Sequence, residues 1–220
     1  HPRGAFYAEQ PAPAGSIAAA GLLQGKALSF NNIADADAAL ACVRALSRGT
    51  ACVIVKHANP CGAALGTDVK EAYERAYATD PTSAFGGIIA FNRPLDGDTA
   101  DLILRRQFVE VIVAPGIDAA ARAALAKKPN VRVLAYDAAA TPAAGLDYKR
   151  VSGGLLVQEA DGATAADTDL KVVSRRAPDE REWRDLRFAW SVAKFVKSNA
   201  IVLASGERTM VERNNATEAT

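Results

Sequence analysis

Cysteine, histidine and methionine are scarce in this sequence of 220 residues, which contains three cysteines, two histidines and one methionine. The cysteines are Cys42, Cys52 and Cys61, an odd number at uneven spacing, so the pattern excludes the framework of a disulfide-stapled protein. Free thiols are typical of proteins in a reducing compartment. The sequence also lacks the paired cysteines of a structural zinc site.

Charge of one sign and long apolar runs are missing as well. The 26 Lys+Arg and 25 Asp+Glu residues leave a formal net charge of +1, which argues against a generic binder of nucleic acids or membrane surfaces. No apolar run approaches the roughly 20 residues of a membrane-spanning helix, and the sequence opens on His1 without the apolar core of a secretion signal. We therefore predict a cytoplasmic protein that binds neither nucleic acid nor membrane.

The composition, 50% hydrophobic and 23% charged, is that of a globular protein with a sizeable core. Segments with helical periodicity alternate with short apolar runs, which predicts a layered α/β fold with a mostly parallel or mixed sheet flanked by helices. In such folds ligands usually bind at the carboxyl ends of the strands. We predict helices over residues 35–48, 70–78, 99–107, 119–128 and 180–197, and strands over 51–55, 87–91, 109–113, 131–136, 155–158 and 200–204.

The heptapeptide KHANPCG (residues 56–62) directly follows the apolar run 51–55. His57 can take up a proton near neutral pH, and Lys56 can supply positive charge to a developing anion. Residues 59–62 are predicted to form a turn that holds this pair rigidly. The alternative is that His57 merely ends a strand and that Lys56 is solvated.

Cys61 allows two further hypotheses. It could be a nucleophile activated by His57, or, after Pro60, it could belong to a zinc site of the deaminase type. The second cysteine of such a site is absent, because Ala64 stands in its place. We favour a small packed residue at position 61.

Three other polar or glycine-rich places are candidates for ligand contacts. Residues 82–87 (TSAFGG) permit close backbone approach to a ligand, or form a tight connection between helix and strand. The segment from Lys197 to Asn199 could hydrogen-bond an amide or a carboxylate, or cap a helix. Asn31 and Asn32 are expected to cap the first helix.

Long motifs in a fixed order carry a resemblance to a known family. Over residues 1–209 the chain resembles the bacterial bifunctional enzymes of purine biosynthesis. These join phosphoribosylaminoimidazolecarboxamide (AICAR) formyltransferase to inosine monophosphate (IMP) cyclohydrolase. The motifs are KHANPCG (56–62), TDPTSAFGGIIAFNR (79–93), QFVEVIVAP (107–115), GGLLVQ (153–158) and KFVKSNAIV (194–202).

The resemblance implies a formyltransferase that moves a formyl group from 10-formyltetrahydrofolate, its co-substrate, to the 5-amino group of AICAR. His57 would be the base that takes the proton from the attacking amine, and Lys56 would stabilise the oxyanion or assist the leaving folate nitrogen. The resemblance also implies a core like that of cytidine deaminases, no catalytic zinc, no covalently bound cofactor, and a homodimer.

The resemblance assigns the AICAR contacts to Gly86, Glu110 and Asn199, with Lys197 supporting Asn199. Residues 1–209 correspond to the first formyltransferase subdomain of the family. By this resemblance we expect these 220 residues to contain neither the family's preceding cyclohydrolase domain nor its second formyltransferase subdomain. Residues 210–220 depart from the family, and they lack apolar periodicity, so we expect them to form neither strand nor helix and to be a disordered tail.

Three hypotheses of function follow. The favoured hypothesis is that the chain is part of an AICAR formyltransferase and retains its Lys-His pair. The second is a non-catalytic module that binds a nucleotide or a partner chain. The third is an unrelated hydrolase that uses Cys61, which the extent of the resemblance disfavours.

Overall fold

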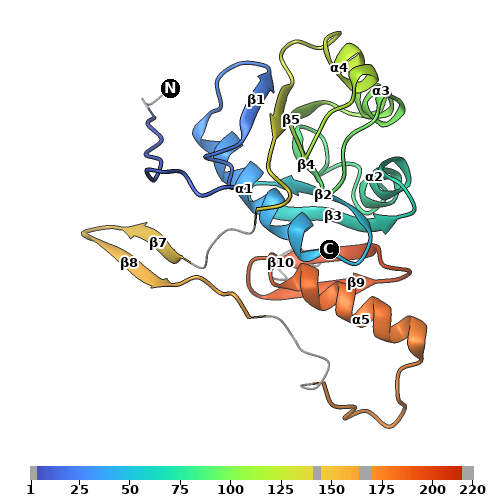
Figure 1. Cartoon of the computed structure of the whole chain (residues 1–220). Coiled ribbons are helices and arrows are strands. Elements are labelled where there is room, and N and C mark those ends of the chain that lie inside the picture. Colours follow the sequence, from blue (N-terminus) through green and yellow to red (C-terminus); the bar gives the residue numbers. More distant parts are fainter. Residues whose placement is uncertain (1–3, 141–144, 164–169, 215–220) are drawn as a thin grey trace.

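The computed structural model describes residues 4–140, 145–163 and 170–214, and the ribbon is shown in Figure 1. Helices and strands alternate along most of this length. The helices are α1 (Phe30–Ala45), α2 (Val69–Tyr77), α3 (Gly97–Arg106), α4 (Ala119–Leu125) and α5 (Glu180–Ala193). The strands are β1 (Gly21–Gln24), β2 (Thr50–Lys56), β3 (Asn59–Gly66), β4 (Gly87–Phe91), β5 (Val109–Ala114), β6 (Arg132–Ala135), β7 (Leu146–Val151), β8 (Gly154–Glu159), β9 (Ala200–Ala204) and β10 (Thr209–Asn214).

Within the described residues, six strands form one sheet in the order β1-β6-β5-β4-β2-β3. The pairs β4–β5 and β5–β6 are parallel, whereas β1–β6, β2–β4 and β2–β3 are antiparallel. The predicted α/β fold is therefore confirmed, and the sheet is mixed rather than mostly parallel. The reason is local: two residues join β2 to β3, and a connection that short can only link antiparallel strands.

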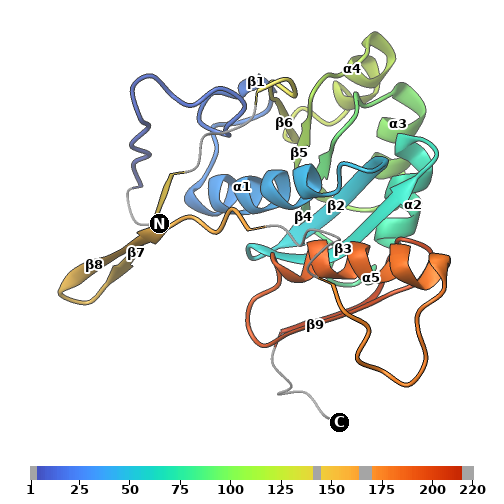
Figure 2. The ribbon, with the colours of Figure 1, turned by 60° about the horizontal axis from the view of Figure 1, so that its bottom comes forward.

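Helices cover both faces of this sheet, as Figures 1 and 2 show. Along β2, Cys52 and Ile54 pack into a core cluster with α2, α3 and α4. Val53 and Val55 pack into a second cluster on the opposite face with α1 and α5. The prediction that residues 51–55 form a strand buried on both faces is confirmed, because alternate side chains of one strand enter opposite clusters.

Capping decides where two of the helices begin. Ser29 is the N-cap of α1, and its side chain and that of Asn32 accept each other's backbone N–H in a capping box. The helix therefore begins five residues earlier than the predicted residue 35. Helix α5 begins at the predicted residue 180 behind Asp179 but ends at Ala193, earlier than the predicted residue 197.

The predicted turn at residues 59–62 is wrong, because these residues open β3. The turn lies one step earlier, at His57 and Ala58, since Lys56 pairs with Asn59 across the hairpin. Strand β3 is at the edge of the sheet, where a proline without an N–H, here Pro60, is tolerated. A register shift between Ile54 and Val55 accommodates the extra residue of β3.

The predicted strand at 200–204 is present, but the prediction that it is buried is wrong. Ile201 and Leu203 are each 57% exposed, whereas Val202 and Ala204 on the other face pack against the core. The reason is that β9 pairs with β10 alone and has only one covered face. The prediction that the stretch from residue 210 forms no strand is also wrong, since β10 extends to Asn214. Residues 215–220 lie outside the described residues.

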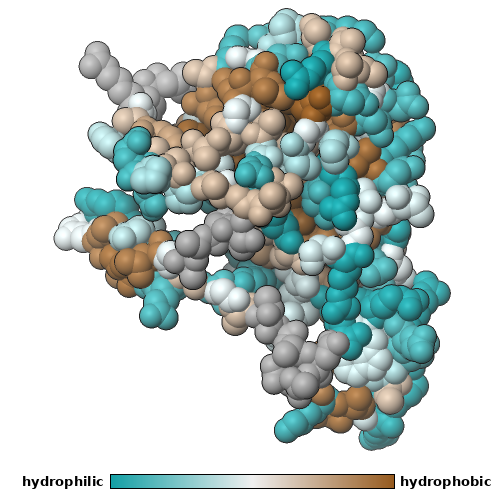
Figure 3. Space-filling view, viewed as in Figure 1, coloured by the Kyte–Doolittle hydropathy of each residue, from teal (hydrophilic) through white to brown (hydrophobic). Residues whose placement is uncertain are grey.

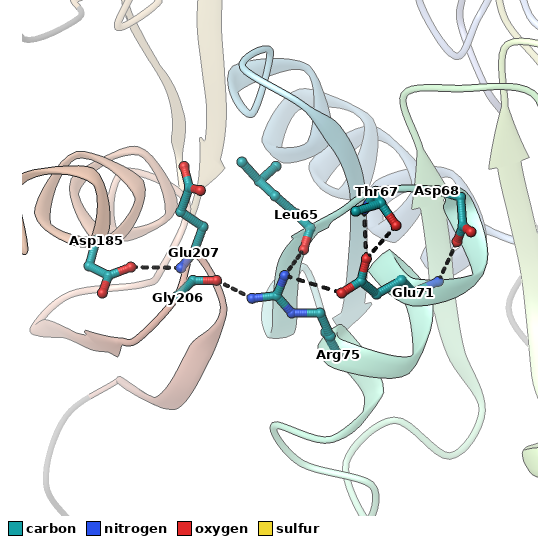
Figure 4. Close-up of polar contacts among 8 residues, drawn as sticks. All are labelled: Leu65, Thr67, Asp68, Glu71, Arg75, Asp185, Gly206 and Glu207. Carbon is teal, nitrogen blue, oxygen red and sulfur yellow. Dashed lines mark hydrogen bonds and ion pairs between the residues drawn. The ribbon is translucent and has the colours of Figure 1, made fainter. Parts of the chain in front are cut away.

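A polar clamp joins the turn between β9 and β10 to the main sheet (Figure 4). Arg75 on α2 donates to the carbonyl oxygens of Leu65, at 2.7 Å, and of Gly206. The backbone N–H of Leu65 donates in turn to the carbonyl oxygen of Glu207 at 2.9 Å. The N–H of Glu207 donates to the Asp185 carboxylate on α5 at 2.7 Å. Helix α5, the β9–β10 hairpin and the edge of the sheet are thus held together by hydrogen bonds to backbone groups.

The β7–β8 hairpin projects away from the body of the molecule (Figures 1 and 2). The predicted strand at 155–158 is confirmed as β8, but β7 was not predicted. One face of the hairpin carries Leu146, Tyr148, Leu155 and Val157, each more than half exposed, and the strand pairing places Arg150 and Glu159 on the same face. The leucine and valine side chains of the hairpin appear as a brown patch in Figure 3. None of the helices within the described ranges is long and apolar enough to cross a membrane.

The start of α5 provides a prediction about pH. The Arg176 guanidinium bonds both carboxylate oxygens of Glu182, which also accepts the N–H of Asp179, and together these bonds lower the pKa of Glu182 to about 2. Because this folded-state pKa lies below the ordinary value of 4.5, the contribution of Glu182 to stability is present above pH 4.5 and is lost as the pH falls toward 2.

We therefore expect amide exchange at the first turn of α5 to quicken as the pH falls through this window, relative to the intrinsic rate. The Glu182→Gln variant should show the faster exchange already at neutral pH and little further change. Equal pH dependence in the two proteins would contradict this assignment.

Candidate functional site

Four of the predicted site residues come together at one end of the main sheet. Strand β2 ends at Lys56 beside the first residues of β4, because Val55 pairs with Ile88. Strand β5 begins at the same end, because Gly87 pairs with Val109. The predicted location at the carboxyl ends of the strands is thus correct for β2 only. Gly86 and Glu110 lie at the amino ends of β4 and β5, since β2 runs opposite to them.

Lys56 reaches across this end of the sheet to the turn before β4. Its Nζ donates to the carbonyl oxygen of Phe85 at 2.6 Å. Gly86 has a left-handed φ of 70°, and a Cβ added there would lie 3.0 Å from Lys56 Nζ and 3.4 Å from the Phe108 ring. A glycine at this position therefore leaves room for the ammonium group. An ammonium has three N–H donors, so Lys56 can donate to a ligand as well.

An exposed aromatic pair borders the Lys56 ammonium. Phe85 and Phe108 are 62% and 53% exposed, and their ring centroids are 5.6 Å apart. The N–H of Gly86 donates to the carbonyl oxygen of Phe108 at 2.8 Å, which ties the two segments together. The cation thus lies beside an apolar surface on which a flat ring could pack.

His57 occupies the turn between β2 and β3, with its side chain exposed. Its φ is 55°, and that of Ala58 is 53°, so both residues are left-handed. The carbonyl oxygen of His57 accepts from Lys197 Nζ at 2.6 Å. The imidazole is therefore carried on a turn whose backbone is held by groups from elsewhere in the fold.

Glu110 lies near the start of β5 and is half-buried. Its Oε2 accepts from Asn32 Nδ2 at 2.8 Å, and Asn32 is only 3% exposed. Each carboxylate oxygen has two acceptor sites, so Glu110 can accept further hydrogen bonds from a ligand amide or amine.

The segment after α5 brings Lys197 to the same turn. In addition to the bond from its Nζ to His57, its backbone N–H donates to Asn59 Oδ1 at 3.0 Å. Asn199 lies two residues further along, immediately before β9. Lys197 is therefore brought to the Lys-His motif from a distance of about 140 residues, whereas a ligand contact of Asn199 stays a prediction.

Sequence reasoning missed three residues that support this site. Asn32 and Asp35 were included in or next to the first predicted helix, but Asn32 holds Glu110, and Asp35 Oδ1 accepts the N–H of Ala58 at 2.7 Å. The buried Gln107 side chain donates to the carbonyl oxygen of Ala84 at 3.0 Å and so supports the turn before Gly86. Asn32 and Asp35 are three residues apart, a spacing that places two polar side chains on one face of a helix. This spacing could have indicated that both side chains contact the same region.

Cys61 lies partly buried in β3, where its thiol donates to the carbonyl oxygen of Ile54 at 3.5 Å. It also packs against the core cluster beneath α2, in agreement with the predicted packing role. Among the described residues, no group of three or more His, Cys, Asp or Glu side chains could hold a metal ion.

The fold and this site define a class: a layered α/β protein that gathers a lysine, a histidine and a carboxylate at one end of a mixed sheet. The family described as "AICARFT/IMPCHase bienzyme" matches residues 1–211. The match covers nearly the whole chain, and the chain belongs to this family of purine biosynthesis enzymes.

Proposed function

We propose that this chain carries the formyltransferase chemistry of its family, the transfer of a formyl group from 10-formyltetrahydrofolate to AICAR. The observation that carries the proposal is the position of the Lys56-His57 pair. It lies at the end of the sheet where Gly86 and Glu110 also lie. Acyl transfer needs a base for the attacking amine and a cation for the oxyanion, and this pair supplies both.

In the proposed reaction the 5-amino nitrogen of AICAR attacks the formyl carbon, and a new C–N bond forms. His57 takes the proton that the amine must lose, because the positively charged nitrogen of the tetrahedral intermediate would otherwise leave again. The formyl oxygen becomes an oxyanion, which the Lys56 ammonium stabilises. The bond from the formyl carbon to the folate nitrogen then breaks, that nitrogen takes up a proton, and tetrahydrofolate leaves.

The substrate would be held by groups around this pair. Glu110 would accept hydrogen bonds from AICAR, and Gly86 would allow the ligand to come close to the backbone. Asn199, supported by Lys197, would donate or accept a further hydrogen bond with AICAR. The reaction needs no catalytic zinc and no covalently bound cofactor. We further propose that the protein works in the cytoplasm as a homodimer, a proposal that the exposed apolar face of the β7–β8 hairpin supports.

Binding of AICAR is the experiment that tests this function. We expect AICAR to bind the chain in calorimetry, and Glu110→Gln to weaken that binding by about tenfold, because a charge-assisted hydrogen bond is lost. Glu180→Gln, an exposed change of the same kind at the start of α5, is the matched control and should leave the affinity unchanged. Sedimentation of the same samples should give the mass of a dimer.

The outcomes separate the hypotheses. Binding together with formyl transfer supports the proposed enzyme, and binding without transfer supports a nucleotide-binding module. No binding by the unaltered chain at millimolar AICAR would overturn the proposal.

A further inference from the structure

The turn that carries His57 has an unfavourable backbone for its sequence. Two-residue hairpin turns in which both residues are left-handed strongly favour glycine and asparagine, because a Cβ in this conformation crowds the following carbonyl oxygen. Here His57 and Ala58 have φ values of 55° and 53°. Something outside the turn must therefore hold it in this shape.

The holding contacts come from two separate elements. Asp35 Oδ1, on α1, accepts the N–H of Ala58 at 2.7 Å. Lys197 Nζ, in the segment after α5, donates to the carbonyl oxygen of His57 at 2.6 Å. Both polar groups of the peptide bond between His57 and Ala58 are thus occupied by side chains from elsewhere. The orientation of that peptide sets the direction in which the His57 side chain extends from the backbone.

The same face of α1 also holds Glu110, the side chain that we propose to bind the substrate. Asn32, one turn before Asp35, donates to Glu110 at 2.8 Å, and residues three apart on a helix lie on one face. The beginning of α1 therefore sets the position of His57 relative to Glu110. The capping box of Ser29 and Asn32 keeps that beginning in place.

We propose that Asp35 is a positioning residue of the site, which holds the His57–Ala58 turn in its left-handed form and so aims the imidazole at the ligand bound beside Glu110. The geometric part of this proposal stands on the contacts of Asp35 and the φ values of the turn. The part about the ligand rests on the proposed function.

The test compares Asp35→Ala and Asp35→Asn in the full chain with Asp37→Asn, a second carboxylate on the same helix. The first readout is amide exchange at Ala58. We expect Asp35→Ala to quicken it roughly 10- to 100-fold, the loss of a hydrogen bond to a charged acceptor. Asp35→Asn, whose amide oxygen can still accept, should give an intermediate value, and Asp37→Asn should give none of the effect. Unchanged exchange in Asp35→Ala would overturn the proposal.

The second readout is the rate of formyl transfer and its rescue. We expect kcat to fall about 100-fold in Asp35→Ala with little change in the KM for AICAR, because the base is misplaced while the binding groups remain. Adding Ala58→Gly should recover much of that loss, since glycine adopts the left-handed conformation without help. A general loss of stability would not be rescued in this way, so equal kcat values with and without Ala58→Gly would contradict the positioning role.

The two proposals fail in different ways. If the unaltered chain neither binds AICAR nor transfers a formyl group, the proposed function fails, and the exchange experiment still decides whether Asp35 holds the turn. If the chain is active but Asp35→Ala has the kcat of the unaltered chain, the proposed function survives and the positioning role of Asp35 fails.

Discussion

Replacement of His57 by alanine is expected to lower the rate of formyl transfer by roughly 10²- to 10⁴-fold, the usual contribution of a general base. The AICAR amine is conjugated with its ring and is a weak nucleophile, so removal of its proton during the attack is needed for the product to form. His57 is suited to this role because it is exposed at the end of the sheet on a turn held at both of its polar groups.

Binding separates loss of catalysis from loss of structure in this experiment. AICAR should bind His57→Ala within a few-fold of the unaltered affinity, since we assign substrate binding to other residues. Lys56→Ala should also reduce the rate, because the oxyanion loses its cation, whereas Lys70→Ala, an exposed lysine on α2, should not. The base assignment fails if His57→Ala retains full turnover.

Thr209→Val is expected to lower the free energy of unfolding by about 1–3 kcal/mol, the range for leaving buried polar groups without partners. Thr209 is fully buried. Its hydroxyl oxygen accepts a hydrogen bond from the N–H of Ala63 at 2.9 Å, and the hydroxyl donates to the carbonyl oxygen of Ala63 at 3.1 Å. Thr79 donates to the Thr209 carbonyl oxygen at 2.7 Å. Valine has the same shape but no hydroxyl, so it leaves both backbone groups of Ala63 without this partner.

Arg75→Ala should have an effect of similar size, about 1.5–3 kcal/mol, because the carbonyl oxygens of Leu65 and Gly206 lose a charged donor. Urea unfolding measures both changes. Arg105→Ala, an exposed arginine at the end of α3, is the control and should change stability by less than about 0.5 kcal/mol. Thr209→Ser, which keeps the hydroxyl, should retain most of the free energy of unfolding that Thr209→Val loses. Equal stability of Thr209→Val and the unaltered chain would refute the role of the Thr209 hydroxyl, and equal stability of Arg75→Ala would refute that of the clamp.

The α/β class and the β4 strand illustrate what could be predicted from local sequence. Residues 87–91 form an uninterrupted apolar run between polar segments, and the structure has β4 over the same five residues. Strand β7 illustrates the opposite case. Its sequence, LDYKRV, mixes polar and apolar residues, and nearly all of them are exposed, so it lacks the continuous apolar signal that the buried strands share.

The amino-acid sequence by itself determined which residues are candidates for the site. The Lys56-His57 pair was proposed from its position after an apolar strand and from its chemistry, whereas Gly86 and Glu110 were assigned by the resemblance to the family, and the roles of all four stay proposals. Tertiary structure alone decided how these groups meet. The direction of β2 relative to β4, and the contacts of Asp35 and Lys197 with one turn, join residues that lie far apart in the sequence. Such contacts depend on strand register and helix packing, which no local pattern of residues specifies.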